Sequence, residues 1–120
     1  DGRLRMSLQD PPAGYPVMSG IILTTLITAI VHLSFGIPLF VLNGLGYLGL
    51  LVLLYAPLAA LERFRPAVRY VLIGYTVLTI VLYFVMGPPF MAVGLLTKAV
   101  EAILVVLLVV EAGRARRAAR

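Results

Sequence analysis

The sequence contains no cysteine and little charge. The lack of cysteine excludes disulfides, thiolate metal sites and thiol nucleophiles. Charged residues make up only 12% of the 120 residues, whereas hydrophobic residues make up 62%. A soluble domain averages about 25% charged and about 45–50% apolar residues. The composition therefore excludes an ordinary soluble domain, and we expect no room for a soluble catalytic domain.

Long stretches without charge predict membrane-spanning helices. From Pro16 to Leu61 the chain carries no charge unless His32 is protonated. A helix needs about 20 apolar residues to cross the hydrocarbon core, and in lipid its backbone polar groups must be satisfied internally. We therefore expect an all-α integral membrane protein, a single-domain four-helix transmembrane bundle made of two helical hairpins. The expected spans are residues 17–35, 38–56, 67–86 and 90–110.

Polar and basic segments flank the expected spans. We expect a polar lead over residues 1–16, where Pro16 and two earlier prolines oppose a helix, and a frayed basic tail over residues 111–120. Short basic loops stay in the cytoplasm, so both termini of a four-span chain are expected there. The net charge of +5 then indicates topology and not nucleic-acid binding. We expect Glu62 and Glu111 to be solvated beside the cytoplasmic anchors, which are Arg63, Arg65, Arg69, Arg114, Arg116 and Arg117.

Two charged residues, Lys98 and Glu101, lie inside the fourth expected span. At about 1.5 Å per residue, Glu101 falls near the midplane of a hydrocarbon core about 30 Å thick. Each charge costs on the order of 2.5–3.5 kcal/mol at such a depth. Because residues i and i+3 share a helix face, we expect the two side chains to pair with each other, with a neighbouring helix or with a partner chain.

Further polar residues fall at similar depths in the other spans. Thr25, Thr28 and His32 share one face of the first span, and the threonines are expected to bond back to their own helix. His32 can serve as a proton relay or bind a metal, or bind a pigment if the chain belongs to a photosynthetic complex. We hypothesise one polar cluster between the helices that opens toward the outside. Its expected members are His32, Asn43, Thr79, Tyr83, Lys98 and Glu101.

The expected cluster has three interpretations. It can be a self-satisfied contact that fixes helix packing, an interface with another subunit, or a site for transport or proton transfer. Intramembrane ionisable residues are candidates for function, whereas the spacing of Lys98 and Glu101 favours packing. Tyr70 and Tyr83 lie near opposite ends of their span, where tyrosine commonly anchors a helix at the membrane interface.

Small residues follow a pattern that resembles a nucleotide-binding loop. The stretch NGLGYLG, residues 43–49, contains G-x-G-x-x-G. The dinucleotide fingerprint needs a strand before it and a helix after it, whereas this stretch lies within an apolar helix. Small residues in lipid allow two helix backbones to approach closely. We therefore expect helix packing at Gly44, Gly46, Gly49, Gly74 and Gly94.

Two families of small membrane proteins show partial resemblance. The chain is similar in length and span count to the small multidrug-resistance transporters, but their essential glutamate lies in the first span and Glu101 lies in the fourth. The stretch PLFVLNGLGYLG, residues 38–49, resembles the second span of the small fluoride channels, which has an asparagine followed by spaced glycines. The third span lacks the Thr-Thr-Phe-Ser stretch of those channels. The resemblances assign the chain to neither family.

The expected function is therefore not enzymatic. The leading hypothesis is a structural, accessory or interaction subunit of a larger membrane complex, because the outer loops are short and long aliphatic faces are available for contact. The alternative is a small oligomeric transporter or channel, with Glu101 as the proton or cation site and Lys98 as its modulator. We expect the lipid bilayer and either other membrane subunits or further copies as partners, no nucleic acid, and no cofactor beyond bound lipid.

Overall fold

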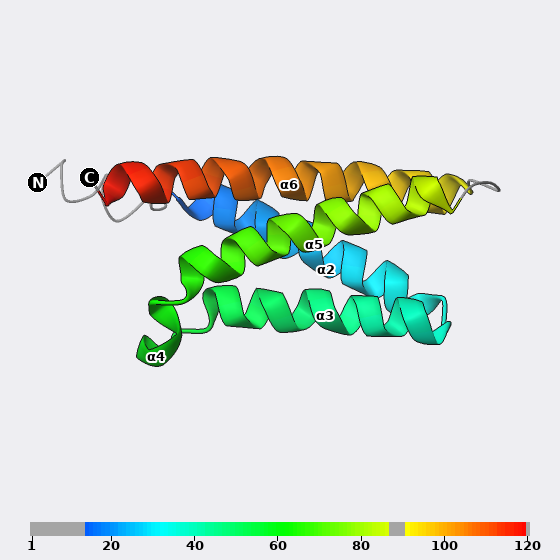
Figure 1. Cartoon of the computed structure of the whole chain (residues 1–120), viewed down its shortest axis with the longest axis horizontal. Helices are drawn as coiled ribbons and strands as arrows, with labels where there is room; N and C mark the ends of the chain where they lie inside the picture. The colour runs from blue at the N-terminus through cyan, green and yellow to red at the C-terminus, as the bar shows by residue number, and fades with distance from the viewer. Residues whose placement is uncertain (1–13, 87–90, 120) are drawn as a thin grey trace, which may run out of the picture.

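The computed structural model describes residues 14–86 and 91–119, and these residues are helical apart from short connections. The described part contains no strand. Four helices are long and apolar enough to cross a membrane, so the expected all-helical architecture with four long apolar helices is confirmed. The elements are α2 (Tyr15–Ser34), α3 (Pro38–Tyr55), the short α4 (Ala59–Glu62), α5 (Arg65–Val85) and α6 (Ala92–Ala118) (Figure 1).

Proline and glycine determine several helix boundaries. The helices α2, α3 and α5 each carry a proline in their first turn, where the missing N–H costs no hydrogen bond. Gly36, between α2 and α3, has a φ of 67°, which glycine adopts without steric cost. Pro57 follows the end of α3 at Tyr55. The tight connection between the first two spans therefore follows from the local sequence.

Some boundaries differ from the expected ones. The expected frayed tail is wrong, because α6 continues to Ala118; alanine and arginine are good helix formers, and arginines near a helix C-terminus interact favourably with the helix dipole. Pro16 does not oppose a helix but lies in the first turn of α2. The basic loop contains α4, which was not expected. Most of the expected polar lead, and the connection at residues 87–90, lie outside the described residues.

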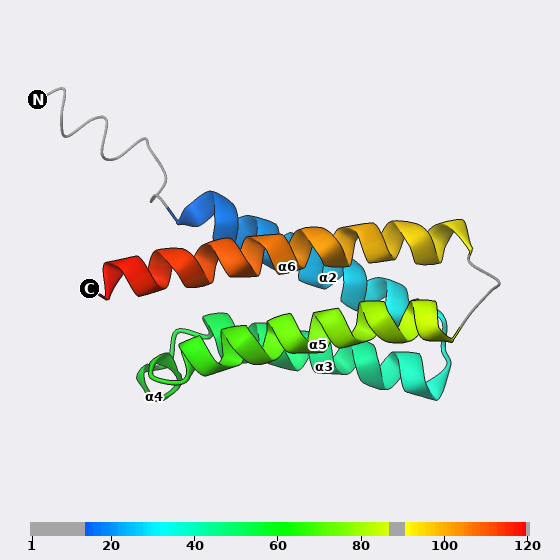
Figure 2. The ribbon, with the colours of Figure 1, turned by 45° about the horizontal axis from the view of Figure 1, so that its top comes forward.

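The four long helices run along one common direction. The start of α2, the short α4 and the end of α6 lie at one end of the molecule (Figures 1 and 2). We call this the basic end, and the opposite end, where residues 35–37 join α2 to α3, the hairpin end. The helix α2 packs against α3 and α6, and α5 packs against α6 and less extensively against α3. The buried apolar core consists of Ile21, Ala29, Tyr47, Leu54, Leu72, Leu104 and Leu108.

Only some of the glycines act as packing points. A Cβ at Gly44 would lie 2.9 Å from the carbonyl oxygen of Ala29, so α2 and α3 approach closely there. Gly46 and Gly94 each face the hydroxyl of a tyrosine on α5. Gly49 and Gly74 face open space, so the expected helix packing at these two positions does not occur among the residues that the structure describes.

Candidate functional site

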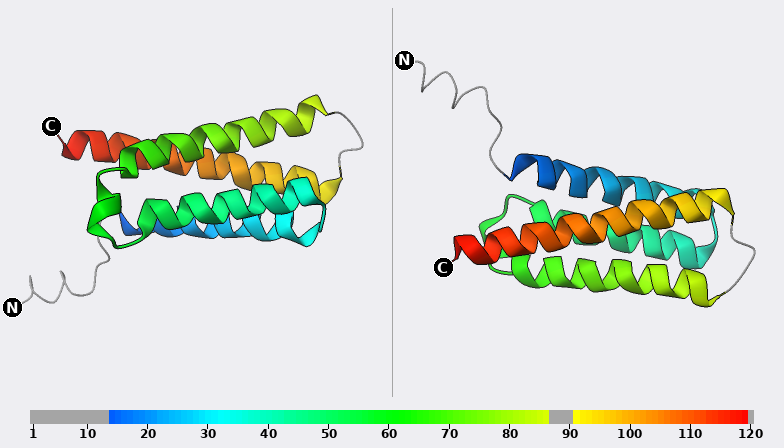
Figure 3. Two further views of the ribbon diagram at one scale, coloured as in Figure 1. Left: turned by 60° about the horizontal axis from the view of Figure 1, so that its bottom comes forward. Right: turned by 90° about the horizontal axis from the view of Figure 1, so that it is seen from above.

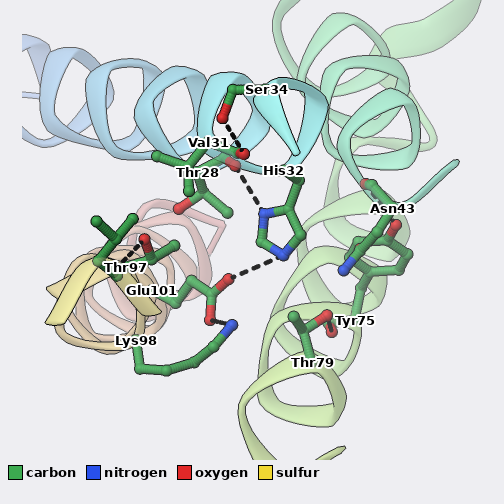
Figure 4. A network of polar contacts seen from close by, with 11 residues as sticks. Thr28, Val31, His32, Ser34, Asn43, Tyr75, Thr79, Thr97, Lys98 and Glu101 are labelled. Atoms are coloured by element: carbon green, nitrogen blue, oxygen red, sulfur yellow. Dashed lines mark hydrogen bonds and ion pairs between the residues drawn. The ribbon is translucent and has the colours of Figure 1, made fainter. Parts of the chain in front are cut away.

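Lys98 and Glu101 form an ion pair on one face of α6. The Lys98 Nζ lies 2.7 Å from the Glu101 Oε2 and donates a hydrogen bond to it. Glu101 is 0% exposed and Lys98 is 7% exposed. The spacing of one helical turn therefore pairs these side chains directly, which is the first of the three expected arrangements (Figure 4).

His32, on α2, faces the same carboxylate from the other side. Its Nδ1 lies 2.7 Å from the carbonyl oxygen of Thr28, one turn earlier in α2. Its Nε2 lies 3.9 Å from the Glu101 Oε1. Figure 4 shows the imidazole ring between α2 and the carboxylate. We refer to His32, Lys98 and Glu101 as the triad.

The triad is incompletely hydrogen-bonded. Within the described part of the chain, the Glu101 Oε1 and the Thr28 hydroxyl oxygen are both buried and have no hydrogen-bond partner. A buried polar atom without a partner costs about 1–3 kcal/mol. Such atoms in a folded protein call for an explanation, such as a proton, a water molecule or a ligand that completes the bonding.

Aromatic rings of α3 and α5 border the triad. The ring centroid of His32 lies 5.9 Å from that of Tyr47, and Tyr47 meets Tyr75 edge-on at 4.8 Å. The Tyr75 hydroxyl donates a hydrogen bond of 2.7 Å to the backbone oxygen of Asn43, which joins α5 to α3. Lys98 Nζ lies 5.1 Å from the ring centroid of Tyr83, within the range of a cation–π interaction. Tyr83 thus lies against Lys98, and its expected position at the membrane interface stays a prediction.

Most threonines in the bundle are satisfied by their own helix. Thr25, Thr76, Thr79 and Thr97 each donate a hydrogen bond to the carbonyl oxygen four residues earlier. The expected back-bonding is therefore confirmed for Thr25 and is wrong for Thr28, whose hydroxyl has no hydrogen-bond partner among the described residues. The hydrogens of these hydroxyls are thus donated to backbone carbonyls. The charged and aromatic side chains are the main groups of the site that remain for chemistry.

A cavity of about 950 Å³ lies beside the triad, in the half of the molecule toward the hairpin end. The helices α3 and α5 diverge in this direction (Figure 3, left). Exposed leucines of α3 and α5 line it on one side, including Leu42 and Leu78. Glu101 does not line the cavity and lies behind Lys98 and His32. The polar lining residues are His32, Asn43, Tyr75, Thr79, Tyr83, Thr97 and Lys98.

The structure brings together the six residues of the expected polar cluster. Five of them line the cavity, and Glu101 bonds to one of those five. Sequence reasoning missed Tyr47 and Tyr75, although tyrosines in the middle of an apolar span are themselves a signal. It also missed Thr28 as a site residue; its place on one stripe with His32 was the available clue.

A second polar cluster lies at the basic end and was not expected. Glu111 of α6 accepts a hydrogen bond of 2.7 Å from the Tyr55 hydroxyl and one of 2.9 Å from the Arg69 Nε. The expectation of a solvated Glu111 is wrong, because Tyr55 and Arg69 approach it from α3 and α5. Arg69 is 8% exposed and is therefore a buried partner rather than a free anchor. We call Tyr55, Arg69 and Glu111 the basic-end cluster.

The triad can hold and transfer a proton. Among the described residues, no group of three or more histidine, cysteine or acidic side chains could hold a metal ion. On His32, the Nδ1 is engaged by Thr28, so the Nε2 is left to ligate a metal or pigment, and it faces the Glu101 carboxylate. These two atoms lie 3.9 Å apart, so they can share a proton only if they approach each other.

Comparison with known proteins leaves this geometry as the basis for functional inference. The sequence matches no protein-family model, and it shows no significant similarity to a curated protein or to a solved structure.

Proposed function

We propose that the chain is a multi-pass membrane protein that binds a lipid-soluble molecule with an anionic head group in the cavity. The observation that carries the proposal is Lys98, a buried ammonium group that lines a cavity of about 950 Å³. Ligand pockets usually have volumes of about 300–1,000 Å³. The four long apolar helices support insertion in a bilayer, and the arginines favour an orientation with the basic end in the cytoplasm.

The lining of the cavity matches the two parts of an amphiphile. An ammonium group has three N–H donors, and Lys98 gives one of them to Glu101. The Asn43 and Thr79 side chains line the same cavity and add polar contacts for a head group. Leu42 and Leu78, on the side where α3 and α5 diverge, are 68% and 56% exposed. An apolar tail can pass between such side chains into surrounding lipid without loss of apolar contact.

The intrachain ion pair favours ligand binding over the accessory role expected from composition. The accessory hypothesis rests on short outer loops and long aliphatic faces, and a partner chain was one of the three expected partners for Lys98 and Glu101. Their pairing within one chain makes that partner unnecessary. Ligand binding resembles the transporter alternative, in which Glu101 was the binding site and Lys98 its modulator. Here Lys98 binds the anion and Glu101 holds Lys98 in place.

Single tryptophan reporters test the proposal directly, since the sequence contains no tryptophan. Leu82→Trp places a fluorophore on the cavity lining of α5, whereas Leu96→Trp places one on an exposed face of α6 outside the lining. Each variant is reconstituted in phosphatidylcholine vesicles and titrated with 11-bromoundecanoate, whose bromine quenches nearby tryptophan. We expect saturable quenching of Leu82→Trp and only weak, linear quenching of Leu96→Trp.

The same titration contains its own controls. Adding Lys98→Met to Leu82→Trp removes the proposed anion-binding group, so the quenching is expected to saturate only at ligand concentrations about tenfold to a hundredfold higher. Adding Glu62→Gln, an exposed change at the basic end, is expected to leave the quenching unchanged. Equal, non-saturable quenching at both tryptophans contradicts the proposal. Recovery of the chain from its native membrane in a stoichiometric complex with a larger protein favours the accessory role instead.

A further inference from the structure

His32 and Glu101 face one another through two atoms that both accept hydrogen bonds. A carbonyl oxygen can only accept, so the bond of 2.7 Å between Nδ1 and the Thr28 oxygen places a hydrogen on Nδ1. A neutral imidazole then has a lone pair on Nε2. That lone pair points toward the Glu101 Oε1, at a distance of 3.9 Å. Both atoms are therefore acceptors, and neither carries a hydrogen to donate to the other.

One added proton completes this contact. On Nε2 it makes an imidazolium that donates to the carboxylate, and on Oε1 it makes a carboxylic acid that donates to the imidazole. Within the described residues the Oε1 has no other hydrogen-bond partner. Hydrogen bonds of this kind span about 2.7–3.2 Å, so an approach of roughly one ångström closes the gap.

The charge of the triad links that proton to a ligand. Without the proton, Lys98 and Glu101 cancel and His32 is neutral; with it, the buried site carries a net charge of one. An unbalanced charge is costly in an apolar interior. An anionic head group beside Lys98 restores neutrality, and it also attracts the ammonium away from Glu101, whose carboxylate then holds a proton more readily.

We propose that the cavity takes up one proton together with each anionic head group, and that His32 and Glu101 share this proton. The inference rests on the proposed function and specifies its ligand class: a lipid-soluble weak acid, which binds as an anion plus a proton. Binding of the proton and of the anion then strengthen each other by the same factor, as thermodynamic linkage requires.

The groups around His32 leave few other places for the proton. Its own helix α2 contributes the Thr28 backbone oxygen and hydroxyl, and α3 contributes Tyr47. Phenol groups carry no charge at neutral pH. The remaining ionisable groups that face the cavity or the triad are Tyr75 and Tyr83 of α5 and Lys98 and Glu101 of α6. Within residues 14–86 and 91–119, the triad is the group at this site that changes charge when it gains a proton near neutral pH.

Calorimetry with an alkyl sulfonate tests the inference. Dodecane sulfonate stays anionic across the working pH range, so any proton taken up on binding goes to the protein. The full chain in phosphatidylcholine nanodiscs is titrated at one pH in phosphate and in Tris, which differ in ionisation enthalpy. We expect the difference between the binding enthalpies to correspond to uptake of about one proton for each sulfonate bound. Over the pH range of this uptake, the affinity falls about tenfold for each unit by which the pH rises.

Two variants locate the proton. In Glu101→Gln the carboxylate is gone, so sulfonate binding is expected to persist with no proton uptake and no dependence on pH. Glu62→Gln, the exposed control, keeps the uptake of the wild type. If Glu101→Gln does not fold, His32→Gln serves instead, with proton uptake reduced to less than half because the shared partner is lost.

The outcomes separate the inference from the proposed function. Saturable sulfonate binding without proton uptake in the wild type overturns the inference and leaves the proposed function intact. Uptake that is unchanged in both Glu101→Gln and His32→Gln also overturns it, because the proton then resides elsewhere. Absence of saturable binding of sulfonate and of 11-bromoundecanoate overturns the proposed function itself.

Discussion

The molecule places two glutamates on α6 in contrasting surroundings. Both carboxylate oxygens of Glu111 accept hydrogen bonds, from Tyr55 and Arg69. Among the described residues, one oxygen of Glu101 does so, from Lys98 on the same helix, and the other has no hydrogen-bond partner. The basic-end cluster joins three helices and does not line the cavity, whereas two members of the triad line it. The fully bonded carboxylate of Glu111 joins helices, whereas that of Glu101 leaves one buried acceptor without a partner in the described part of the chain.

The largest expected effect concerns the basic-end cluster. Glu111→Gln leaves Arg69 without a countercharge, and the loss of one partner from a fully buried pair costs about 3–5 kcal/mol. Because Arg69 and Glu111 keep slight exposure, we expect a loss of roughly 2–3 kcal/mol in the free energy of unfolding. Equilibrium unfolding in detergent micelles measures it. Adding Arg69→Met is expected to recover most of the loss, and an unchanged stability of Glu111→Gln refutes a structural role for the cluster.

The next effect separates binding from stability in the triad. Lys98→Met is expected to weaken 11-bromoundecanoate binding between about tenfold and a hundredfold, since a hydrogen bond to a charged group contributes about 1.5–3 kcal/mol. It also leaves Glu101 buried without its partner. The double variant Lys98→Met with Glu101→Gln is expected to be more stable than Lys98→Met alone, yet no better at binding. Recovery of binding in the double variant is incompatible with Lys98 as the anion-binding group.

A smaller effect tests whether α2 and α3 pack closely at Gly44. At Gly44 a methyl group would lie 2.9 Å from the Ala29 carbonyl oxygen, and overpacking of this kind costs about 1–3 kcal/mol. Gly44→Ala is therefore expected to destabilise the contact between α2 and α3. Gly49→Ala is the matched control on the same helix, because its methyl group meets nothing within 4 Å. Equal thermal unfolding temperatures for the two variants argue against a tight α2–α3 contact.

The smallest effect compares one tyrosine from each region. Tyr55→Phe removes one of the two hydrogen bonds to Glu111, and Tyr75→Phe removes the bond to the Asn43 backbone oxygen. Net hydrogen-bond contributions are about 0.5–1.5 kcal/mol, and bonds to charged groups lie toward or above the upper end. We expect Tyr55→Phe to destabilise the protein more than Tyr75→Phe. The reverse order in chemical denaturation weakens the contrast between the clusters.

Local spacing was sufficient to predict the features that lie within one helix. Apolar run lengths predicted four long helices, and one-turn spacing predicted that Lys98 and Glu101 pair. These two inferences hold because run length and helix geometry determine them. The gathering of His32 and Asn43 near the pair was also predicted, but from equal depth, which only limits the possible neighbours of a residue across a bundle.

Contacts between helices could not be predicted in the same way. Arg69 and Glu111 are separated by 42 positions in the chain, and their contact depends on how α5 is rotated against α6. The sequence showed an arginine near each glutamate and therefore suggested solvated charges. Gly74 shows the same difficulty. A glycine permits a neighbouring helix to approach closely, but whether a helix lies there depends on the packing of the bundle. The cavity depends on the divergence of α3 and α5, for which the sequence has no local signal.

The exposed leucines beside the cavity, Leu42 and Leu78, have a consequence for how a ligand is supplied. In a bilayer these side chains would meet acyl chains, so we expect the proposed ligand to arrive by lateral diffusion in the plane of the membrane. Occupancy then follows the mole fraction of the ligand in the lipid and not its concentration in water. Molecules that partition strongly into the bilayer are enriched at the site before any contact with Lys98, so a weak intrinsic affinity is sufficient for high occupancy.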